Sequence, residues 1–306
     1  MDTNPTPASG APETFRSGFV GLIGKPNVGK STILNYFLGR KISITSPRPQ
    51  TTRRRIMGIL TRPDAQIVFI DTPGWHRPEN PLGRMMVTTA KGVMEEADVL
   101  VMVLEATSGI REEDEWVFNE VRKAKHPAIV AINKVDAVKK GLVLPLLEHV
   151  AALRIFEEHI PISAKTNENM EVLLEEAVKR LPTGPRWYEE GQLTDQSAEQ
   201  LISEFIREQA LQLTRQEVPQ AIAVLIDERT EKETVTLIRA TILVEREGQK
   251  AIVIGRQGQM LKRIGTVARM EIERFLGRKV FLELWVKVIK TWRKDPVLLR
   301  QLGYSA

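Results

Sequence analysis

The sequence predicts two domains: an α/β domain with a mostly parallel sheet, followed by a smaller, basic α+β domain. The length of 306 residues is about twice that of a typical domain. Strand-like runs alternate with amphipathic stretches up to residue 181, and a segment rich in proline and glycine then interrupts the pattern. Residues 246–294 contain 13 Lys or Arg and only four Asp or Glu. We therefore predict a disordered tail at 1–14, the α/β domain at 15–182, a linker at 183–194 and the second domain at 195–306.

The chain contains no cysteine, which excludes disulfide scaffolds and thiolate metal sites and favours a reducing, intracellular setting. Residues 1–14 have neither a basic region nor an apolar core, so we expect no signal peptide. The longest apolar runs, among them 99–104, are far shorter than the roughly 20 residues that a bilayer requires. We therefore expect a cytoplasmic protein without a transmembrane segment.

The α/β domain is indicated by segments of the two kinds that alternate along the chain. Buried strands are expected at 19–24, 66–71, 98–106, 127–133 and 159–164, and helices at 31–39, 112–124 and 169–181. Such alternation produces a mostly parallel sheet with helices on both faces. Ligands of these sheets bind beyond the carboxyl ends of the strands, so the residues that follow each strand are the candidates for a site.

The first predicted strand is followed by GKPNVGKS at 24–31, directly before a predicted helix. A loop of the pattern GxxxxGKS turns successive backbone amides toward phosphate oxygens, and the helix N-terminus adds partial positive charge. In this chemistry Lys30 reaches the β- and γ-phosphates, and Ser31 is a ligand of Mg²⁺. The nucleotide contacts predicted here are Gly24, Lys25, Pro26, Asn27, Val28, Gly29, Lys30, Ser31 and Thr32.

Three further motifs, each at the end of a predicted strand, indicate guanine as the base: DTPG at 71–74, NKVD at 133–136 and SAK at 163–165. The Asp136 carboxylate can accept two hydrogen bonds from guanine, a donor pair that adenine lacks. Asp71 can hold Mg²⁺ through water, and the Gly74 amide can contact the γ-phosphate. The contacts predicted in these motifs are Asp71, Thr72, Pro73, Gly74, Asn133, Lys134, Asp136, Ser163, Ala164 and Lys165. The four motifs, in this order, resemble the GTP-binding domain of the Ras-like P-loop superfamily, which implies GTP and GDP as ligands and Mg²⁺ as cofactor.

The loop PQTTRRR, at 49–55, lies where Ras-like domains have a mobile segment whose threonine binds Mg²⁺ only when the γ-phosphate is present. Thr51 and Thr52 compete for this role, and we favour Thr52. The predicted metal ligands are Ser31, Thr52 and Asp71. The predicted catalytic residues are Lys30, Thr52, Gly74 and Asn27.

Residue 75 departs from the Ras-like pattern, because Trp75 stands where those proteins have a glutamine that orients the attacking water. An indole cannot do this, so we expect slow hydrolysis unless another group completes the site. Asn27 is a candidate: GTPases with a hydrophobic residue at the glutamine position and an asparagine here resemble enzymes that bind K⁺ beside the phosphates. A structural role for Asn27 in the loop backbone is the open alternative.

In the second domain, GRQG at 255–258 lacks the GKS sequence of a phosphate loop and matches the GxxG loop of KH domains, which clamps single-stranded nucleic acid. Alternation would make 251–255 a strand, whereas the KH resemblance implies a short helix. Around this loop we expect a helix at 197–213 with Ser197 as N-cap and strands at 221–228, 234–245 and 279–289, the element order of a type II KH fold. The RNA contacts implied by the resemblance are Gly255, Arg256, Gln257, Gly258, Lys262 and Arg263.

A GTPase domain joined to a KH domain resembles the Era family. The resemblance extends over the chain after the tail and includes GKPNVGKST, QTTRRR, DTPG, NKVD, SAK, VIGRQG, LELWVKV and LRQLGY. It implies a bacterial GTPase that binds the 3′ end of 16S rRNA, assists assembly of the 30S subunit and associates peripherally with the inner face of the cell membrane; we expect a monomer. Two alternatives are a GTP-gated RNA chaperone with negligible hydrolysis, which Trp75 favours, and a GTPase acting in tRNA modification, whose relatives carry different accessory domains.

Overall fold

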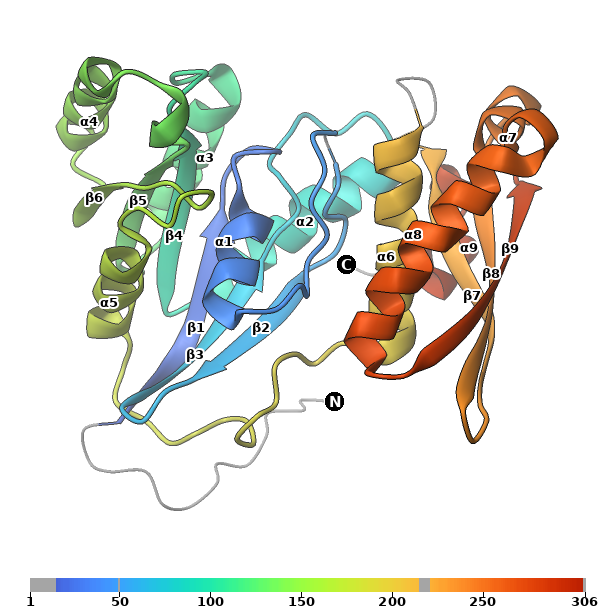
Figure 1. Cartoon of the computed structure of the whole chain (residues 1–306). Helices are drawn as coiled ribbons and strands as arrows, with labels where there is room; N and C mark the ends of the chain where they lie inside the picture. Colours follow the sequence, from blue (N-terminus) through green and yellow to red (C-terminus); the bar gives the residue numbers. More distant parts are fainter. Residues whose placement is uncertain (1–14, 49, 215–220, 305–306) are drawn as a thin grey trace. The chain divides into compact units, whose positions relative to one another are not determined.

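The computed structural model describes residues 15–48, 50–214 and 221–304 (Figure 1). The predicted tail at 1–14 lies outside the described residues, as does Pro49 in the predicted metal-binding loop. The chain divides into two compact units. The N-terminal unit comprises residues up to 43 together with 52–77 and 86–195, and the C-terminal unit comprises 44–51, 78–85 and 196 onward.

The N-terminal unit is built on a six-stranded sheet in the order β2-β3-β1-β4-β5-β6. The strands are β1 Arg16–Ile23, β2 Ile56–Thr61, β3 Ala65–Asp71, β4 Val99–Glu105, β5 Ala128–Asn133 and β6 Glu158–Pro161. Every neighbouring pair is parallel except β2 with β3. The mostly parallel sheet is therefore confirmed, and β2 is an edge strand that the sequence patterns did not predict.

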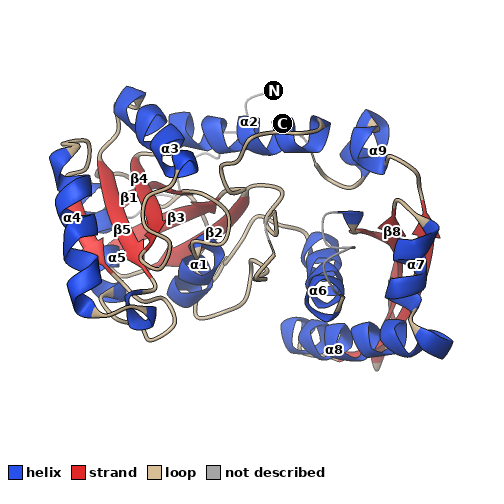
Figure 2. Cartoon of the chain, turned by 90° about the horizontal axis from the view of Figure 1, so that it is seen from above, coloured by secondary structure: helices blue, strands red, loops and turns tan. Residues whose placement is uncertain are grey.

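Helices cover both faces of this sheet (Figure 2). They are α1 Lys30–Leu38, α2 Pro81–Glu96, α3 Glu112–Lys123, α4 Val143–Ala152 and α5 Met170–Arg180. Apolar side chains of α2, α3 and α4 form one buried cluster with alternate residues of β4 and β5. On the other face Phe37 of α1 stacks on Phe69 of β3 with ring centroids 5.0 Å apart. The cores on the two faces fix the carboxyl ends of β1, β3, β5 and β6, from which the predicted motifs emerge.

The predicted linker is bonded to the edge of the N-terminal unit along most of its length. The Ile59 amide of β2 donates to the Leu193 carbonyl over 2.9 Å, and the Thr194 hydroxyl donates to the Met57 carbonyl over 2.6 Å. Further along, the Gln66 side chain accepts from two linker amides. These residues therefore cover the outer edge of β2 and extend the N-terminal unit to residue 195.

The C-terminal unit has a three-stranded sheet in the order β7-β8-β9, with β7 and β8 antiparallel and β8 and β9 parallel. Its elements are α6 Ala198–Leu213, β7 Ala223–Glu231, β8 Val235–Val244, α7 Glu247–Ile254, α8 Gln259–Leu276, β9 Lys279–Val288 and α9 Pro296–Gln301. Ser197 caps α6: its hydroxyl accepts from the Gln200 amide, which has no hydrogen-bond acceptor within the helix. The element order is the one expected of a type II KH fold, and 251–254 are helical as the resemblance implied. Within the described ranges, no helix is both long enough and apolar enough to cross a membrane.

Candidate nucleotide site and glycine turn

The loop at 24–31 connects β1 to α1 and closes tightly around its own backbone. Gly29 has a φ of 109°, and a Cβ at this position would lie 2.2 Å from the side-chain nitrogen Nδ2 of Asn133, so only glycine fits. The Lys30 ammonium donates to the carbonyls of Gly24 and Lys25 over 3.0 and 2.9 Å. The loop is thus shaped in advance, with a buried cation at the start of α1, which is the arrangement that binds nucleotide phosphates.

Lys30 and Asp71 are two buried, opposite charges at this site. Burial lowers the pKa of Lys30 to about 8, although the carboxylates of Asp71 and Asp114 oppose the shift. Burial likewise raises the pKa of Asp71, against the effect of Lys30 and of hydroxyl groups that bond to the carboxylate. Desolvation disfavours each charge. A phosphate beside Lys30 and a cation beside Asp71 would therefore favour the charged form of both groups.

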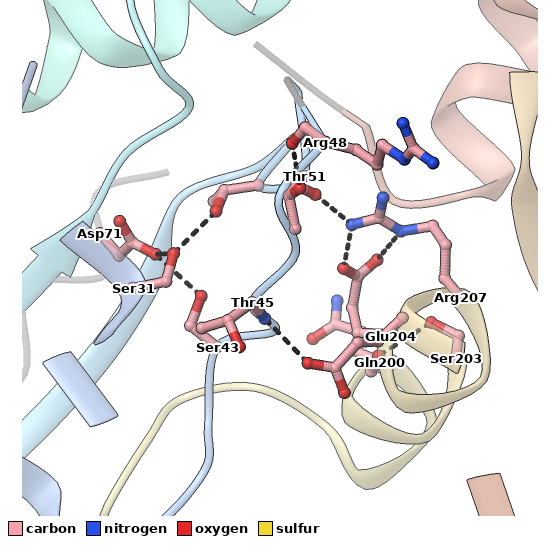
Figure 3. A network of polar contacts seen from close by, with 12 residues as sticks. Ser31, Ser43, Thr45, Arg48, Thr51, Asp71, Gln200, Ser203, Glu204 and Arg207 are labelled. Carbon is pink, nitrogen blue, oxygen red and sulfur yellow. Dashed lines mark hydrogen bonds and ion pairs between the residues drawn. The ribbon is translucent and has the colours of Figure 1, made fainter. Parts of the chain in front are cut away.

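Hydroxyl groups converge on the Asp71 carboxylate (Figure 3). Asp71 Oδ2 accepts from Ser31 Oγ at 2.6 Å and from Ser43 Oγ at 2.8 Å, and Thr52 Oγ1 lies 3.0 Å from Ser31 Oγ. Asp71 Oδ1 is buried without a hydrogen-bond partner among the described residues. A carboxylate and hydroxyls are the oxygen ligands that Mg²⁺ prefers, and the unpartnered oxygen can serve a metal-bound water, so the residues present fit Mg²⁺.

The two threonines of the loop after Ser43 have different surroundings. The Thr51 hydroxyl donates to the Arg48 carbonyl over 2.6 Å, whereas the Thr52 hydroxyl lies beside Ser31. The structure therefore places Thr52, rather than Thr51, at the candidate metal site. Ser43 also bonds to Asp71, a contact that was not predicted because a lone serine in a loop gives no pattern.

Asn133, at the end of β5, ties the phosphate loop to the SAK segment. Its amide group donates to the Val28 carbonyl over 2.8 Å, and its side-chain oxygen accepts from the Ala164 amide at 3.0 Å. Lys134 extends across the loop and donates to the Asn27 carbonyl over 2.8 Å. These bonds bring together three of the predicted motifs although they are up to 137 positions apart in the numbering, from Asn27 to Ala164.

Asp136 lies in a short 3₁₀ turn, Val135–Ala137, beside the SAK segment. Its side chain is exposed, and Oδ1 accepts from Ser163 Oγ at 2.7 Å. Lys165 is exposed, whereas Ser163 and Ala164 are buried. The Ser163 bond fixes the Asp136 carboxylate, and both of its oxygens retain acceptor positions for a ligand, as recognition of a base edge requires.

The DTPG segment begins at the end of β3 and lies against the phosphate loop. Thr72 is anchored to the Leu22 carbonyl of β1 over 2.7 Å, and Pro73 is buried. Gly74 lies directly beside Pro26. The next residue, Trp75, is only 6% exposed and packs into the cluster of α2, α3 and α4. Its indole therefore belongs to the hydrophobic core.

The Lys25 side chain turns to α3, a contact that was not predicted from the sequence. Its ammonium bonds to Asp114 Oδ2 over 2.8 Å and to Ser108 Oγ over 3.0 Å. Asp114 is fully buried and also accepts from the Arg111 amide at 2.9 Å, as an acidic residue in the first turn of a helix commonly does. The acidic start of α3 was a signal for a helix N-terminus but not for a partner in the phosphate loop.

The second glycine turn, 255–258, joins α7 to α8. Gly255 has a φ of 72°, and a Cβ there would lie 2.5 Å from the Cβ of Met260. Gly258 and Gln257 also have positive φ, of 75° and 50°. Val253 on one side and Ile264 on the other are fully buried, so the turn is held at both ends.

Cationic side chains surround this turn and are exposed. They are Arg256 within it and Lys262 and Arg263 on the first turns of α8. Across the described ranges, none of these three residues forms a salt bridge. A tight turn with accessible backbone and exposed cations suits a sugar–phosphate backbone, and it differs from the enclosed loop at 24–31.

Comparisons with known proteins agree with this division. A family model described as 50S ribosome-binding GTPase matches residues 19–134, and a KH domain model matches 217–293. GTPase Era of Syntrophus aciditrophicus is 46% identical over 293 residues, covering 95% of this chain and 96% of that protein.

Two solved structures are similar over almost the whole chain. One is Era in complex with MgGDPNP and nucleotides 1506–1542 of 16S ribosomal RNA, and the other is a variant of Aquifex aeolicus Era bound to GDP·AlF4⁻. Each is 43% identical, and each comparison covers 95% of this chain and 100% of the other, with TM-scores of 0.93 and 0.92.

Proposed function

The chain belongs to the Era family of GTPases, and on this premise we propose that it hydrolyses GTP and binds the 3′ end of 16S rRNA during assembly of the 30S ribosomal subunit. One observation supports the proposal that the chain hydrolyses GTP. The phosphate loop, the Asp71 cluster (Ser31, Ser43, Thr52 and Asp71) and the Asn133–Asp136 turn meet at one edge of the sheet, joined by direct hydrogen bonds. The Era–RNA complex and the exposed cationic turn at 255–258 support the proposal that the chain binds 16S rRNA.

Phosphate binding is assigned to the loop and to Lys30. The amides at the start of α1 bind the phosphate oxygens, and the Lys30 ammonium neutralises charge on the β- and γ-phosphates. Ser31, Thr52 and Asp71 are assigned to Mg²⁺, which when bound withdraws charge from the same oxygens. Because Ser31 and Thr52 already lie beside Asp71, little rearrangement of these side chains is needed.

Selectivity for guanine is assigned to Asp136, whose carboxylate accepts from both donors on the guanine edge. A backbone amide of the segment 163–165 is assigned to the carbonyl oxygen of the base; the Ala164 amide donates to Asn133 Oδ1, so it would have to exchange that partner for the base. Asn133 binds no base in this scheme; it holds Ala164 and Val28 in place.

Asp136→Asn tests this assignment. An asparagine keeps the size of the side chain but accepts only one of the two hydrogen bonds. GTP affinity should fall by about 1.5–3 kcal/mol, the scale of a hydrogen bond to a charged group, and preference should move toward xanthosine triphosphate. A nucleotide titration measures both, with ATP as a negative control. GTP binding equal to that of the unmodified chain would remove Asp136 from the site.

Turnover by the isolated protein is proposed to be slow, because Trp75 is packed in the core and supplies no group that orients water. Whether Asn27 takes part through a bound K⁺, or only shapes the loop, is decided by comparing rates in K⁺ and Na⁺ at equal ionic strength. A faster rate in K⁺ supports the ion, and equal rates leave Asn27 structural. Single-turnover hydrolysis also separates the enzyme from a GTP-gated RNA chaperone, which would show none.

Several finer assignments complete the proposal. We propose a monomer in the cytoplasm, with a fraction associated peripherally with the inner face of the cell membrane and the 30S subunit as the assembly that it serves. Family membership supports these assignments. The RNA contacts are assigned to Gly255, Arg256, Gln257, Gly258, Lys262 and Arg263.

A further inference from the structure

The segment between Ser43 and Thr52 belongs to the C-terminal unit, although both of its flanking residues belong to the N-terminal unit. Ser43 and Thr52 are the two residues of this loop whose hydroxyls lie in the Asp71 cluster. Between them, residues 44–48, 50 and 51 are described. Ser43 and Thr52 are each joined to this segment by a single peptide bond. A shift of the segment would therefore move the Ser43 and Thr52 hydroxyls.

Side chains of α6 hold this segment near both ends (Figure 3). At its start, the Thr45 amide donates to Glu208 Oε1 over 2.9 Å, and the Thr45 carbonyl accepts from Gln212 Nε2 at 3.2 Å. Glu208 and Gln212 are one helical turn apart, so they present both groups on one face of α6. At the other end, the Arg207 guanidinium donates to the Thr51 carbonyl.

Arg207 is buried to an extent that is unusual for arginine, with 1% of its surface exposed. Its charge is paired with Glu204 on the same helix, and one further nitrogen, Nη1, is buried without a partner in the described part of the chain. If the Thr51 carbonyl moved away, Nη2 would keep only the Glu204 bond while still shielded from water. The buried charge thus favours the loop conformation in which Thr51 stays in place.

We propose that Arg207 and Glu208 of α6 are positioning residues for GTP hydrolysis, acting through the loop that carries Thr52. They contact neither nucleotide nor metal. They hold residues 45 and 51 so that the Ser43 and Thr52 hydroxyls remain beside Asp71 and Ser31. The inference rests on the proposed function, because it assumes that Mg²⁺ and the γ-phosphate bind at that cluster.

The test uses the full chain and three changes in α6. Glu208→Ala removes the acceptor for the Thr45 amide, and Glu208→Gln keeps an oxygen there. Arg207→Met is combined with Glu204→Gln, so that the ion-pair partner Glu204 is not left as a buried carboxylate without its counter-charge. The matched control is Arg229→Met with Glu199→Gln. This variant also removes an arginine that is bonded to a carboxylate of α6, but the side-chain bonds of Arg229 go to Glu199 and Glu231.

The measurements are kcat and KM for GTP, the Mg²⁺ concentration for half-maximal rate, and GDP affinity by displacement of a fluorescent GDP analogue. Glu208→Ala and the Arg207 double variant should lower kcat by about tenfold or more, the order expected when a reacting group is displaced by a fraction of an ångström to 1 Å. Both should need more Mg²⁺. GDP affinity should be unchanged, since Thr52 serves the γ-phosphate state. Glu208→Gln should recover most of the rate, and the control should match the unmodified chain.

Two results would overturn the proposal. One is an unchanged kcat and Mg²⁺ requirement in variants whose thermal unfolding shows an intact fold. The other is a loss of GDP affinity parallel to the loss of kcat, because α6 would then support the whole site rather than this loop. Failure of the proposed function is distinguishable, since the unmodified chain would then show no Mg²⁺-dependent GTP turnover.

Discussion

The two glycine turns, 24–31 and 255–258, both contain residues with positive φ, but their surroundings are opposite. In the first, Lys25 and Lys30 are buried and their ammonium groups are bonded to Asp114 and to loop carbonyls. In the second, the cations nearest the turn are exposed and, within the described residues, form no salt bridge. The first turn is therefore suited to a small enclosed ligand, and the second is suited to contacts with a charged polymer.

Burial decides how binding free energy is distributed in each case. In an enclosed site every charge is desolvated, so the loss of one group leaves its neighbours unpaired. On an exposed surface, each phosphate contact adds a similar and modest amount. Single substitutions should therefore have large effects in the first turn and small ones in the second.

The largest effect is expected when the buried pair Lys25–Asp114 is broken. Lys25→Met leaves a fully buried carboxylate that, among the described residues, keeps only the hydrogen bond from the Arg111 amide, and it should lower the free energy of unfolding by about 3–5 kcal/mol. Adding Asp114→Leu should recover part of this loss. Urea unfolding measures it, with Arg239→Met, from an exposed ion pair of the C-terminal unit, as the control that should change little. A small loss of unfolding free energy in Lys25→Met would mean that burial at this turn contributes little to stability.

Lys30→Ala comes next. It removes the ammonium assigned to the γ-phosphate and should reduce single-turnover hydrolysis by at least about a hundredfold, the effect of losing one preorganised charged donor. RNA affinity should be unchanged, because 255–258 lies in the other unit. If RNA binding in the absence of nucleotide also fell, the two turns would not act independently, which would contradict the comparison.

Replacing Arg256 and Gln257 together by Asp should have an intermediate effect. Both glycines remain, so the turn should form, and neither side chain is buried. Two negative charges against the RNA backbone should lower affinity by about tenfold or more at low salt and less at high salt. GTP hydrolysis should not change. Wild-type RNA affinity in a variant with normal circular dichroism would make the turn structural only.

The smallest effect is expected for Lys262→Ala, which removes one exposed cation of α8. It should weaken RNA binding about equally for all sequences and reduce the slope of log K against log salt by about one. Binding isotherms at four or more salt concentrations give the slope. A drop as large as that of the double Asp variant would show that one contact dominates, as in an enclosed site.

Local patterns predicted the nucleotide motifs because each is a short sequence at the end of a strand, and the strands were visible as apolar runs. The edge strand β2 and helices α2 and α4 were missed, since β2 follows a run of arginines and its antiparallel pairing depends on β3. The bond from Lys25 to Asp114 joins residues 89 positions apart, which no local pattern reveals. Arg207 has the sequence signature of an exposed helix residue, and only tertiary packing buries it. For 251–254, alternation favoured a strand and was wrong, whereas the family resemblance implied the helix that is observed.

The bonding of residues 183–195 to β2 determines where the chain can be cut. A fragment that ends at residue 182 would expose the Ile59 amide and the Met57 carbonyl on the outer edge of β2, which the linker otherwise covers. Open strand edges of this kind pair with other chains and aggregate. An expression product or a natural gene fusion that carries the nucleotide-binding half alone therefore needs to extend to Asp195, so the boundary for exchanging modules lies after the linker rather than before it.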